Sequence, residues 1–388
     1  MHGWITAILR SAALAAAALS LSGCIVLSDS LRHNEIRSVW SKPLPPQQVF
    51  FVTDRAPEGT GFSLHWDGGA AHCGRATVPI ANALSEHPAP DPALEAIACD
   101  ADDDMAAFAR QVADAAKPCG RVLIEVHGYN LSFRTALLHG AQAAMDTQWR
   151  CATILFNWSS EALFNRYAAD IERSGYAVPL MLQLLRALQA VGLKPDILAH
   201  SMGGRITLGA LGALCQAPRP VVGELILAAP DVSAAPGDDD FAQLLKRDAA
   251  CVRRTTLYAS DNDLALIASQ SAHGGVPRAG GHPLRAMDYV SARPRIEVVD
   301  ATLTTGDISG HAYYVFSYEA LADLMWVLDG ASQEKRVGLG TLTCTAWPGD
   351  ACPASGRYAL KVVAERQPGL GQKILRNVMP LVLPLQPN

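Results

Sequence analysis

The chain has 388 residues, of which 49% are hydrophobic and 18% are charged. This composition lies far from the low-hydrophobicity, high-charge range in which chains stay disordered, so we expect a sizeable folded core. The formal net charge is −5, and no block of basic residues stands ready to neutralise the phosphates of a nucleic acid. We therefore expect no nucleic-acid partner, and no apolar run reaches the roughly 20 residues that a membrane-spanning helix needs.

The first 24 residues have the pattern of an export signal. Residues 1–10 carry one positive charge and no acid, and residues 11–21 are rich in alanine and leucine. The run ends in Leu-Ser-Gly-Cys at residues 21–24, which resembles the lipobox of bacterial lipoproteins. The resemblance implies that residues 1–23 form a removed signal peptide and that Cys24 carries the lipid anchor. Cleavage by the general signal peptidase, with an unmodified Cys24, is the alternative.

The residues around the anchor also predict a location and a division into segments. Ile25 stands where an aspartate would favour retention in the inner membrane, so we expect an outer-membrane anchor with the protein facing the periplasm. A Pro-rich stretch then gives an extended tether over residues 24–47. The expected body is a single domain over residues 48–330, followed by a C-terminal β-like extension over residues 331–388.

The cysteines predict disulfides. Eight of the nine remain when Cys24 is set aside, and an even number in an exported chain favours bridges over free thiols, which remain the alternative. Cys119 and Cys151 each precede a predicted strand and could pair if those strands are neighbours, and Cys344 with Cys352 would close a short loop. No spacing typical of a zinc site occurs, and the sequence implies no metal or organic cofactor.

Predicted strands and helices alternate from residue 48 onward. The strands are expected at residues 49–53, 76–80, 121–126, 153–156, 196–199, 224–228, 255–259 and 295–299, and helices at 102–117, 132–149, 161–191 and from about 201. This alternation predicts an α/β fold, with a mostly parallel sheet covered by helices on both faces. We expect the helical stretch between Trp158 and Val191 to form a roof over the site, with apolar residues such as Leu163, Phe164 and Leu180 mainly in the core.

The most informative segment surrounds Ser201. An apolar strand runs into a tight turn with Ser201 at its tip, and a helix follows at once, which is typical of the nucleophile elbow of serine hydrolases. That turn needs small residues two before and two after the serine because backbone atoms approach closely there, and the sequence supplies Ala199 and Gly203. A serine that only caps the helix is the alternative.

A serine nucleophile also needs donors for negative charge and a base. The expected oxyanion donors are the backbone N–H groups of Met202, just after the nucleophile, and of Tyr129, in the loop after an earlier strand. The base must follow the serine in the chain, and His311 is the only histidine after the last core strand. We expect His273 and His282 to be solvent or lid residues.

Three aspartates compete for the role of the acid that orients the base. Asp263 follows the penultimate predicted strand and is the favoured candidate. Asp231 follows the strand before that one, and Asp261 lies two residues before Asp263. All three stay open on the sequence alone.

Eight short segments are similar to those of a known family. They are Phe-Val-Thr-Asp-Arg (51–55), Cys-Gly-Arg (73–75), Val-His-Gly-Tyr-Asn (126–130), Phe-Asn-Trp-Ser-Ser (156–160), Ala-His-Ser-Met-Gly (199–203), Ala-Pro-Asp (229–231), Tyr-Ala-Ser (258–260) and Gly-His-Ala-Tyr (310–313). Together they resemble a bacterial α/β-hydrolase family of uncharacterised function with exported and lipid-anchored members. The resemblance covers about residues 48–330 and implies an α/β-hydrolase fold and a serine-hydrolase apparatus. It supports Asp263, supplies no substrate, and leaves a small C-terminal β-like appendage outside.

The sequence thus leads us to expect a lipid-anchored serine hydrolase that cleaves carboxylic esters of small molecules or lipids. Ser201 would attack, His311 would carry the proton, Asp263 would hold the imidazole, and the amides of Tyr129 and Met202 would bind the oxyanion. A catalytically inactive hydrolase-fold protein that binds an envelope component is the alternative, as is an acyltransferase or peptidase using the same residues. The sequence does not indicate an oligomeric state.

Overall fold

The structure is a computed structural model. It describes residues 38–42, 44–99, 101–163, 166–215, 221–235, 251–283, 296–304, 307, 309–336, 339–341 and 358–360. The expected signal peptide, the lipidation site Cys24, Phe164 and the Cys344–Cys352 pair lie outside the described residues. Among the helices in the described ranges, none combines the length and the apolar character that crossing a membrane requires.

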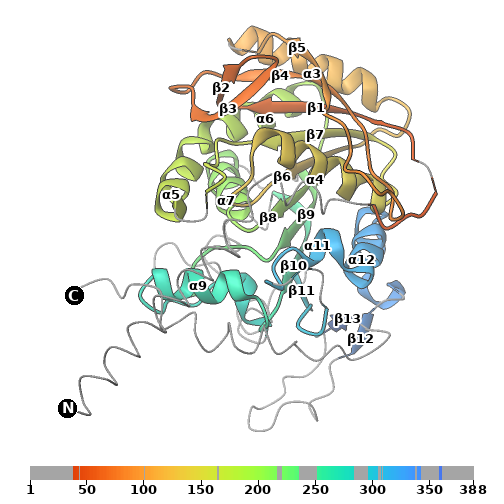
Figure 1. Cartoon of the computed structure of the whole chain (residues 1–388), viewed down its shortest axis with the longest axis vertical. Helices are drawn as coiled ribbons and strands as arrows, with labels where there is room; N and C mark the ends of the chain where they lie inside the picture. Colours follow the sequence, from red (N-terminus) through yellow and green to blue (C-terminus); the bar gives the residue numbers. More distant parts are fainter. Residues whose placement is uncertain are drawn as a thin grey trace.

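A large sheet runs through the molecule (Figure 1). Its strands are β1 (Gln47–Thr53), β4 (His72–Val78), β5 (Ala93–Ile97), β6 (Val122–Val126), β7 (Ala152–Asn157), β8 (Asp196–His200), β9 (Val222–Ala228), β10 (Val252–Ala259), β11 (Ile296–Asp300), β12 (Leu339–Thr341) and β13 (Tyr358–Leu360). Within the described residues it has 11 strands in the order β12-β13-β11-β10-β9-β8-β6-β7-β1-β4-β5. The seven strands from β11 to β1 in that order are mutually parallel, whereas β4 pairs antiparallel with β1.

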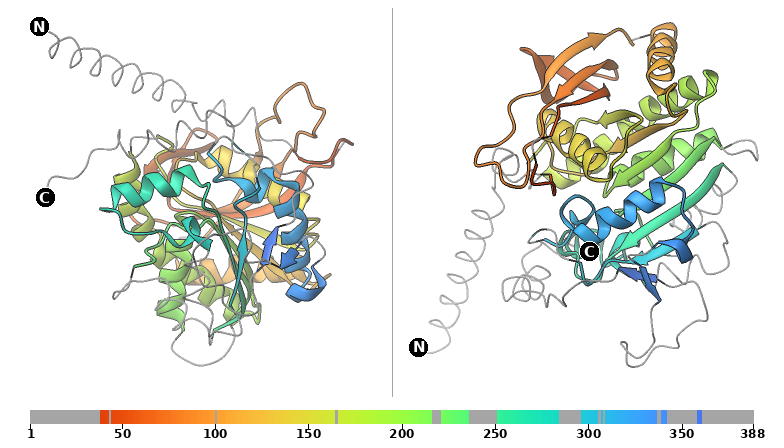
Figure 2. Two further views of the ribbon diagram at one scale, coloured as in Figure 1. Left: turned by 90° about the horizontal axis from the view of Figure 1, so that it is seen from below. Right: turned by 90° about the vertical axis from the view of Figure 1, so that its right-hand side faces the viewer.

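Helices cover both faces of this sheet (Figure 2). They are α3 (Asp102–Ala116), α4 (Phe133–Asp146), α5 (Tyr167–Tyr176), α6 (Val178–Ala190), α7 (Gly203–Leu214), α9 (Leu264–Ala272), α11 (Tyr313–Phe316) and α12 (Tyr318–Leu328). Alternate residues of the strands, such as Ile124 and Ile197, pack against α3, α6 and α7, while their neighbours Leu123 and Leu198 face α4, α11 and α12. The expected α/β-hydrolase architecture, with a mostly parallel sheet between two helical layers, is confirmed.

The segment between Trp158 and Val191 lies only partly over the predicted site, where Tyr167 of α5 packs edge-on against Tyr129. It forms two helices, and α6 packs against α3 and α7 as part of the core layer rather than as a cover. Its buried side chains are Leu180, Met181, Leu184, Leu185 and Leu188. Leu163 was expected in the core, but it is 51% exposed because it lies in the irregular segment before α5. The amphipathic spacing of leucines therefore identified a core helix, and Leu163 falls outside that pattern.

The C-terminal segment adds strands to the same sheet. β13 pairs in parallel with β11, and β12 pairs antiparallel with β13. The two described strands of residues 331–388 therefore extend the edge of the main sheet.

Among the described cysteines, three disulfides join neighbouring parts of the fold: Cys73–Cys99, Cys119–Cys151 and Cys215–Cys251. The pair Cys119–Cys151 confirms the expectation, since these cysteines precede β6 and β7, which are hydrogen-bonded neighbours. Each bridge closes a loop of 26 to 36 residues and so restricts the unfolded chain.

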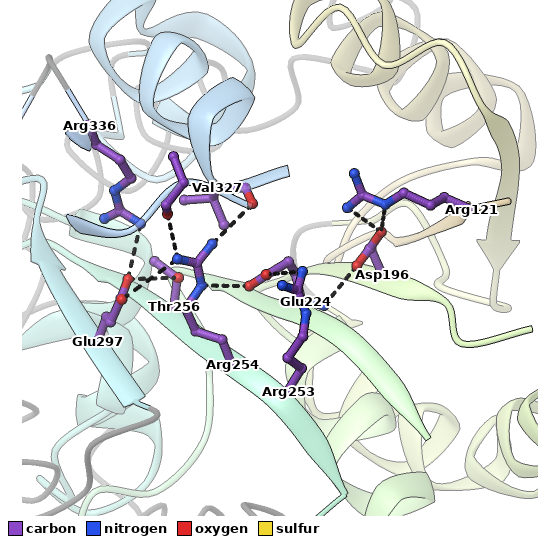
Figure 3. A network of polar contacts seen from close by, with 10 residues as sticks. Arg121, Asp196, Glu224, Arg253, Arg254, Thr256, Glu297, Val327 and Arg336 are labelled. Atoms are coloured by element: carbon purple, nitrogen blue, oxygen red, sulfur yellow. Dashed lines mark hydrogen bonds and ion pairs between the residues drawn. The ribbon is translucent and has the colours of Figure 1, made fainter. Parts of the chain in front are cut away.

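A network of ion pairs holds the amino ends of the parallel strands (Figure 3). The fully buried Glu224 in β9 forms an ion pair with Arg253, whose Nη2 lies 2.5 Å from Oε1, and accepts a hydrogen bond from Arg254 Nε–H at 2.7 Å. Asp196 at the start of β8 accepts Arg121 Nη2 at 2.7 Å and the backbone N–H of Glu224 at 2.7 Å. Carboxylates and arginines from different strands thus neutralise each other at this end of the sheet.

We expect the replacement Glu224→Gln to destabilise the fold by about 3 kcal/mol, because it removes the nearer of the two carboxylates that pair with the partly buried Arg254. The midpoint of urea unfolding, followed by tryptophan fluorescence under oxidising conditions, measures this change. Asp114→Asn is the matched control: its ion pair with Lys117 lies within α3 with both side chains at least 70% exposed, so the midpoint should barely move. Equal shifts in the two variants would contradict the assignment of a structural role to the buried pair.

Candidate active site

Ser201 follows the last residue of β8 and has a left-handed backbone conformation, with φ at +53°. Three backbone hydrogen bonds hold it there: its N–H donates to Ala228 O at 3.0 Å, and its carbonyl accepts Gly204 N–H at 3.0 Å and Asp231 N–H at 3.1 Å. For a residue other than glycine this conformation costs free energy, on the order of 1–3 kcal/mol, and such strain is concentrated at functional sites. The structure thus forms the sharp strand–turn–helix connection expected around Ser201.

Two glycines allow the backbone to close around Ser201. A Cβ atom on Gly203 would lie 2.4 Å from the carbonyl oxygen of Val126, and one on Gly128 would lie 2.9 Å from Ser201 Cβ. Neither distance is possible for a real side chain, so the loop after β6 and the start of α7 can meet only because both positions are glycine.

This close approach is a precondition for the expected oxyanion hole. Met202 is fully buried and occupies the N-cap position of α7, where backbone N–H groups point out of the helix. Tyr129 follows directly on Gly128, which lies against Ser201. The two amides predicted as donors therefore belong to the two segments that converge on the serine.

A buried arginine that the sequence analysis did not single out supports the loop after β6. Arg55 is fully buried and donates to the backbone oxygens of Leu131 at 2.8 Å and Ser160 at 2.9 Å, and to Asn157 Oδ1 at 3.1 Å. It thus ties the ends of β1 and β7 to the loop that carries Tyr129.

The hydroxyl of Ser160 makes a second link to the same loop. It accepts the N–H of Asn130 at 2.7 Å and donates to the buried Asp170 of α5 at 2.6 Å. Asn130 itself has φ at +65°, so the loop is bent as well as anchored. Arg55 and Ser160 both lie in segments that carry the family resemblance, which was the signal that could have identified them.

His311 and Asp263 form a hydrogen-bonded pair. His311 Nδ1–H donates to Asp263 Oδ2 at 2.7 Å, and the other carboxylate oxygen accepts Leu266 N–H at 2.9 Å at the start of α9. Asp263 is fully buried, whereas the His311 side chain is 14% exposed. Because Nδ1 carries the hydrogen toward the carboxylate, Nε2 of the neutral ring is left as a proton acceptor.

The backbone around His311 is fixed as well. Its N–H and that of Ala312 both donate to Asp307 Oδ1 at 3.0 Å. Gly310, with φ at +65°, lies so close to Asn262 that a Cβ atom there would be 2.7 Å from the Asn262 oxygen. The loop of His311 is therefore held directly against the loop of Asp263.

Opposing effects act on the charge of His311. Burial alone would lower the pKa of the imidazole, but the charge and the hydrogen bond of Asp263 outweigh it and raise the pKa above its ordinary value. The carboxylate therefore favours the cationic ring, as a general base requires once it has taken a proton.

His200 connects this pair to the Ser201 turn. Its ring lies between those of His311 and Tyr314, with centroid distances of 4.5 Å and 4.4 Å, and its Nε2–H donates to His311 O at 3.2 Å. Burial, followed by the charge of His311, lowers the pKa of His200 well below its ordinary value. A neutral ring thus separates the two segments. Within the described part of the chain, no hydrogen bond joins the Ser201 hydroxyl to the His311 ring.

The other two candidates for the acid, Asp231 and Asp261, pair with residues other than His311. Asp231 is almost fully buried in an ion pair with Arg278, whose Nε lies 2.7 Å from Asp231 Oδ1. It also accepts the hydroxyls of Ser269 at 2.6 Å and Tyr167 at 2.5 Å. Asp261 lies 3.2 Å from Nδ1 of His282. The structure therefore brings Asp263 to His311, and neither of the alternatives.

The replacement Asp263→Asn should lower the pKa of His311, because burial then acts on the imidazole without the opposing negative charge. An NMR pH titration of the histidine ring protons measures it, with the His311→Gln spectrum giving the assignment. Asp261→Asn removes the same charge two residues away, beside His282, and should leave the His311 titration in place. An unchanged His311 pKa in Asp263→Asn would show that the carboxylate does not control the ring.

Comparison with known proteins agrees with this architecture. A family model described as alpha/beta hydrolase of unknown function (DUF900) matches residues 103–327. The comparison with curated proteins found no match, and the comparison with solved structures found none. Across the ranges that the structure describes, no group of three or more His, Cys, Asp or Glu residues is arranged to hold a metal ion. The match spans more than half of the chain, and the protein belongs to this α/β-hydrolase family.

Proposed function

We propose that the protein is a serine hydrolase that cleaves carboxylic esters through an acyl-enzyme. The observation that carries the proposal is the buried His311–Asp263 pair, held through His200 against the strained turn of Ser201. A nucleophile, a base and an acid that orients the base are the three parts that this chemistry requires.

In the proposed reaction, Ser201 Oγ attacks the acyl carbon of the ester while its proton passes to His311 Nε2. The negative charge that forms on the carbonyl oxygen is bound by the N–H groups of Met202 and Tyr129, and one such donor contributes about 3 kcal/mol to the transition state. His311 then protonates the departing alcohol, leaving the acyl group on the serine. A water molecule, deprotonated by the same imidazole, releases the acid and restores Ser201.

The separation between Ser201 and His311 in the free protein is consistent with this scheme. Catalytic hydrogen bonds are often long or poorly aligned without substrate and shorten in the complex. The other elements are already fixed: Asp263 orients the ring, and Gly203 and Gly128 hold the two loops together. The proposal requires the Ser201 hydroxyl and the His311 ring to come into hydrogen-bond contact when substrate binds.

An inactive binding protein fits these observations less well. The φ angle of +53° at Ser201 costs free energy, and a fold without a catalytic serine could relieve it with glycine. The carboxylate of Asp263 likewise loses its hydration on burial, where it bonds to His311 and to the backbone N–H of Leu266. These two costs are the features that nucleophilic catalysis explains.

Labelling with a fluorophosphonate probe tests the proposed nucleophile. We expect Ser201→Ala to abolish labelling and His311→Gln to slow it by about a thousandfold, because the serine loses its base. Ser271→Ala, which removes an equivalent hydroxyl from α9, should label like the wild type. Persistent labelling of Ser201→Ala, in protein that retains the wild-type circular dichroism spectrum, would refute the assignment.

We also propose that the protein is anchored by a lipid on Cys24 in the outer membrane, facing the periplasm. The three disulfides support an oxidising compartment. The variant Cys24→Ser should lose incorporation of radioactive palmitate and leave the membrane fraction. Unchanged palmitate labelling of this variant would instead show that the lipid is carried elsewhere.

A further inference from the structure

Arg205 lies one helical turn after the proposed nucleophile. Side chains on a helix lean toward its N-terminus, so the guanidinium of Arg205 is directed toward the Ser201 end of α7. This first turn packs against the segment after β9, because a Cβ atom on Gly204 would lie 3.2 Å from Pro230 Cβ and the Asp231 N–H bonds to Ser201 O. Arg205 therefore lies in the first turn of α7, the turn that follows Ser201 and packs against the loop of Asp231.

The Arg205 side chain is partly buried, and its Nε is buried without an acceptor among the described residues. The arginines at the opposite end of the sheet contrast with it, since Arg121 and Arg254 each hold a buried carboxylate. A buried donor that loses its water without gaining an acceptor costs free energy. Native structures rarely contain such a donor unless a ligand or an ion accepts its hydrogen bond.

The nearby carboxylate does not neutralise Arg205. Asp231 is bound by Arg278 through Nε, and Arg278 Nη2 donates to the backbone oxygen of Asp231 at 3.0 Å. Both side chains are only 2% exposed, so this pair is closed and electrically neutral.

His273, directly after α9, forms a cluster with Asp231, Arg278 and Tyr167 and adds no negative charge to it. Its ring packs edge-on against Tyr167, one of the donors to Asp231. Burial lowers the pKa of His273, and the charges of Arg278 and Arg205 lower it further, which places both arginines around the same ring. The described part of the cluster therefore keeps one uncompensated positive charge, that of Arg205.

From this charge balance we infer that Arg205 forms an anion-binding subsite next to Ser201, and that the substrate is an ester carrying a carboxylate or phosphate group a few bonds from the carbonyl. A guanidinium binds such groups through two parallel hydrogen bonds, which fixes orientation as well as position. The inference rests on the proposed function for the reaction itself. It adds to that function the chemical class of the substrate.

Matched esters test this specificity. Methyl hemisuccinate and methyl pentanoate place an anionic or an apolar end on the acyl side, and 3-acetoxypropanoate and butyl acetate do the same on the alcohol side. A third arm, 2-acetoxyethyl phosphate, replaces the carboxylate by a phosphate. We expect Arg205→Gln to lower kcat/KM at least tenfold for an anionic ester and less than twofold for its neutral counterpart.

Two further variants separate binding from general electrostatics. Arg205→Lys keeps the charge but not the forked geometry and should retain part of the preference. Arg186→Gln removes the same charge from an exposed position on α6 and should leave every ratio unchanged. Equal losses for anionic and neutral esters in Arg205→Gln, or an altered ratio in Arg186→Gln, would overturn the subsite.

A binding measurement distinguishes failure of the subsite from failure of the proposed reaction. Calorimetric titration of the Ser201→Ala protein with methyl hemisuccinate should show binding that weakens at least tenfold when Arg205→Gln is added. Absence of binding, or binding that Arg205→Gln does not weaken, would overturn the subsite even if the wild type hydrolyses esters. Binding by a wild-type protein that neither labels nor turns over would support the subsite and remove the hydrolase proposal.

Discussion

The site depends on one geometric constraint, the close approach of two backbone segments at the carboxyl ends of β6 and β8. Gly203 packs against the carbonyl of Val126, and Gly128 packs against Ser201, at distances that exclude any side chain. The left-handed turn at Ser201 follows from this approach, because the chain must leave β8 and enter α7 within two residues. Larger residues at either glycine would push apart the segments that carry the proposed nucleophile and both proposed oxyanion donors.

The amino and carboxyl ends of the parallel strands differ in how their charged groups are paired. At the amino ends, acids and arginines from neighbouring strands are matched in ion pairs (Figure 3). At the carboxyl ends lie a strained serine, a histidine–aspartate pair and Arg205, whose Nε has no acceptor in the described part of the chain. Ligands of parallel α/β sheets bind at the carboxyl ends, so strain and unmatched charge are concentrated where a ligand can compensate them.

Much of this could be predicted from the sequence because it depends on local order. The alternation of strands and helices predicted the layers, and the apolar run before Ser201 predicted the turn at which this residue lies. Cys119 and Cys151 could be paired because each precedes one of two adjacent strands. Arg55 could not be placed in the same way, since its partners come from loops about 80 to 100 residues further along the chain and only the folded state brings them together.

The choice between two acids shows most clearly what the sequence lacks. Asp231 and Asp263 follow the neighbouring strands β9 and β10, so periodicity and spacing treat them alike. Their partners in the folded protein distinguish them. Asp231 forms a buried ion pair with Arg278, whereas Asp263 pairs with His311. The same pairing keeps Asp231 from acting as a counter-ion for Arg205, whose Nε has no acceptor among the residues that the structure describes. One buried arginine therefore bears both on which acid orients the proposed base and on which charge we assign to the substrate.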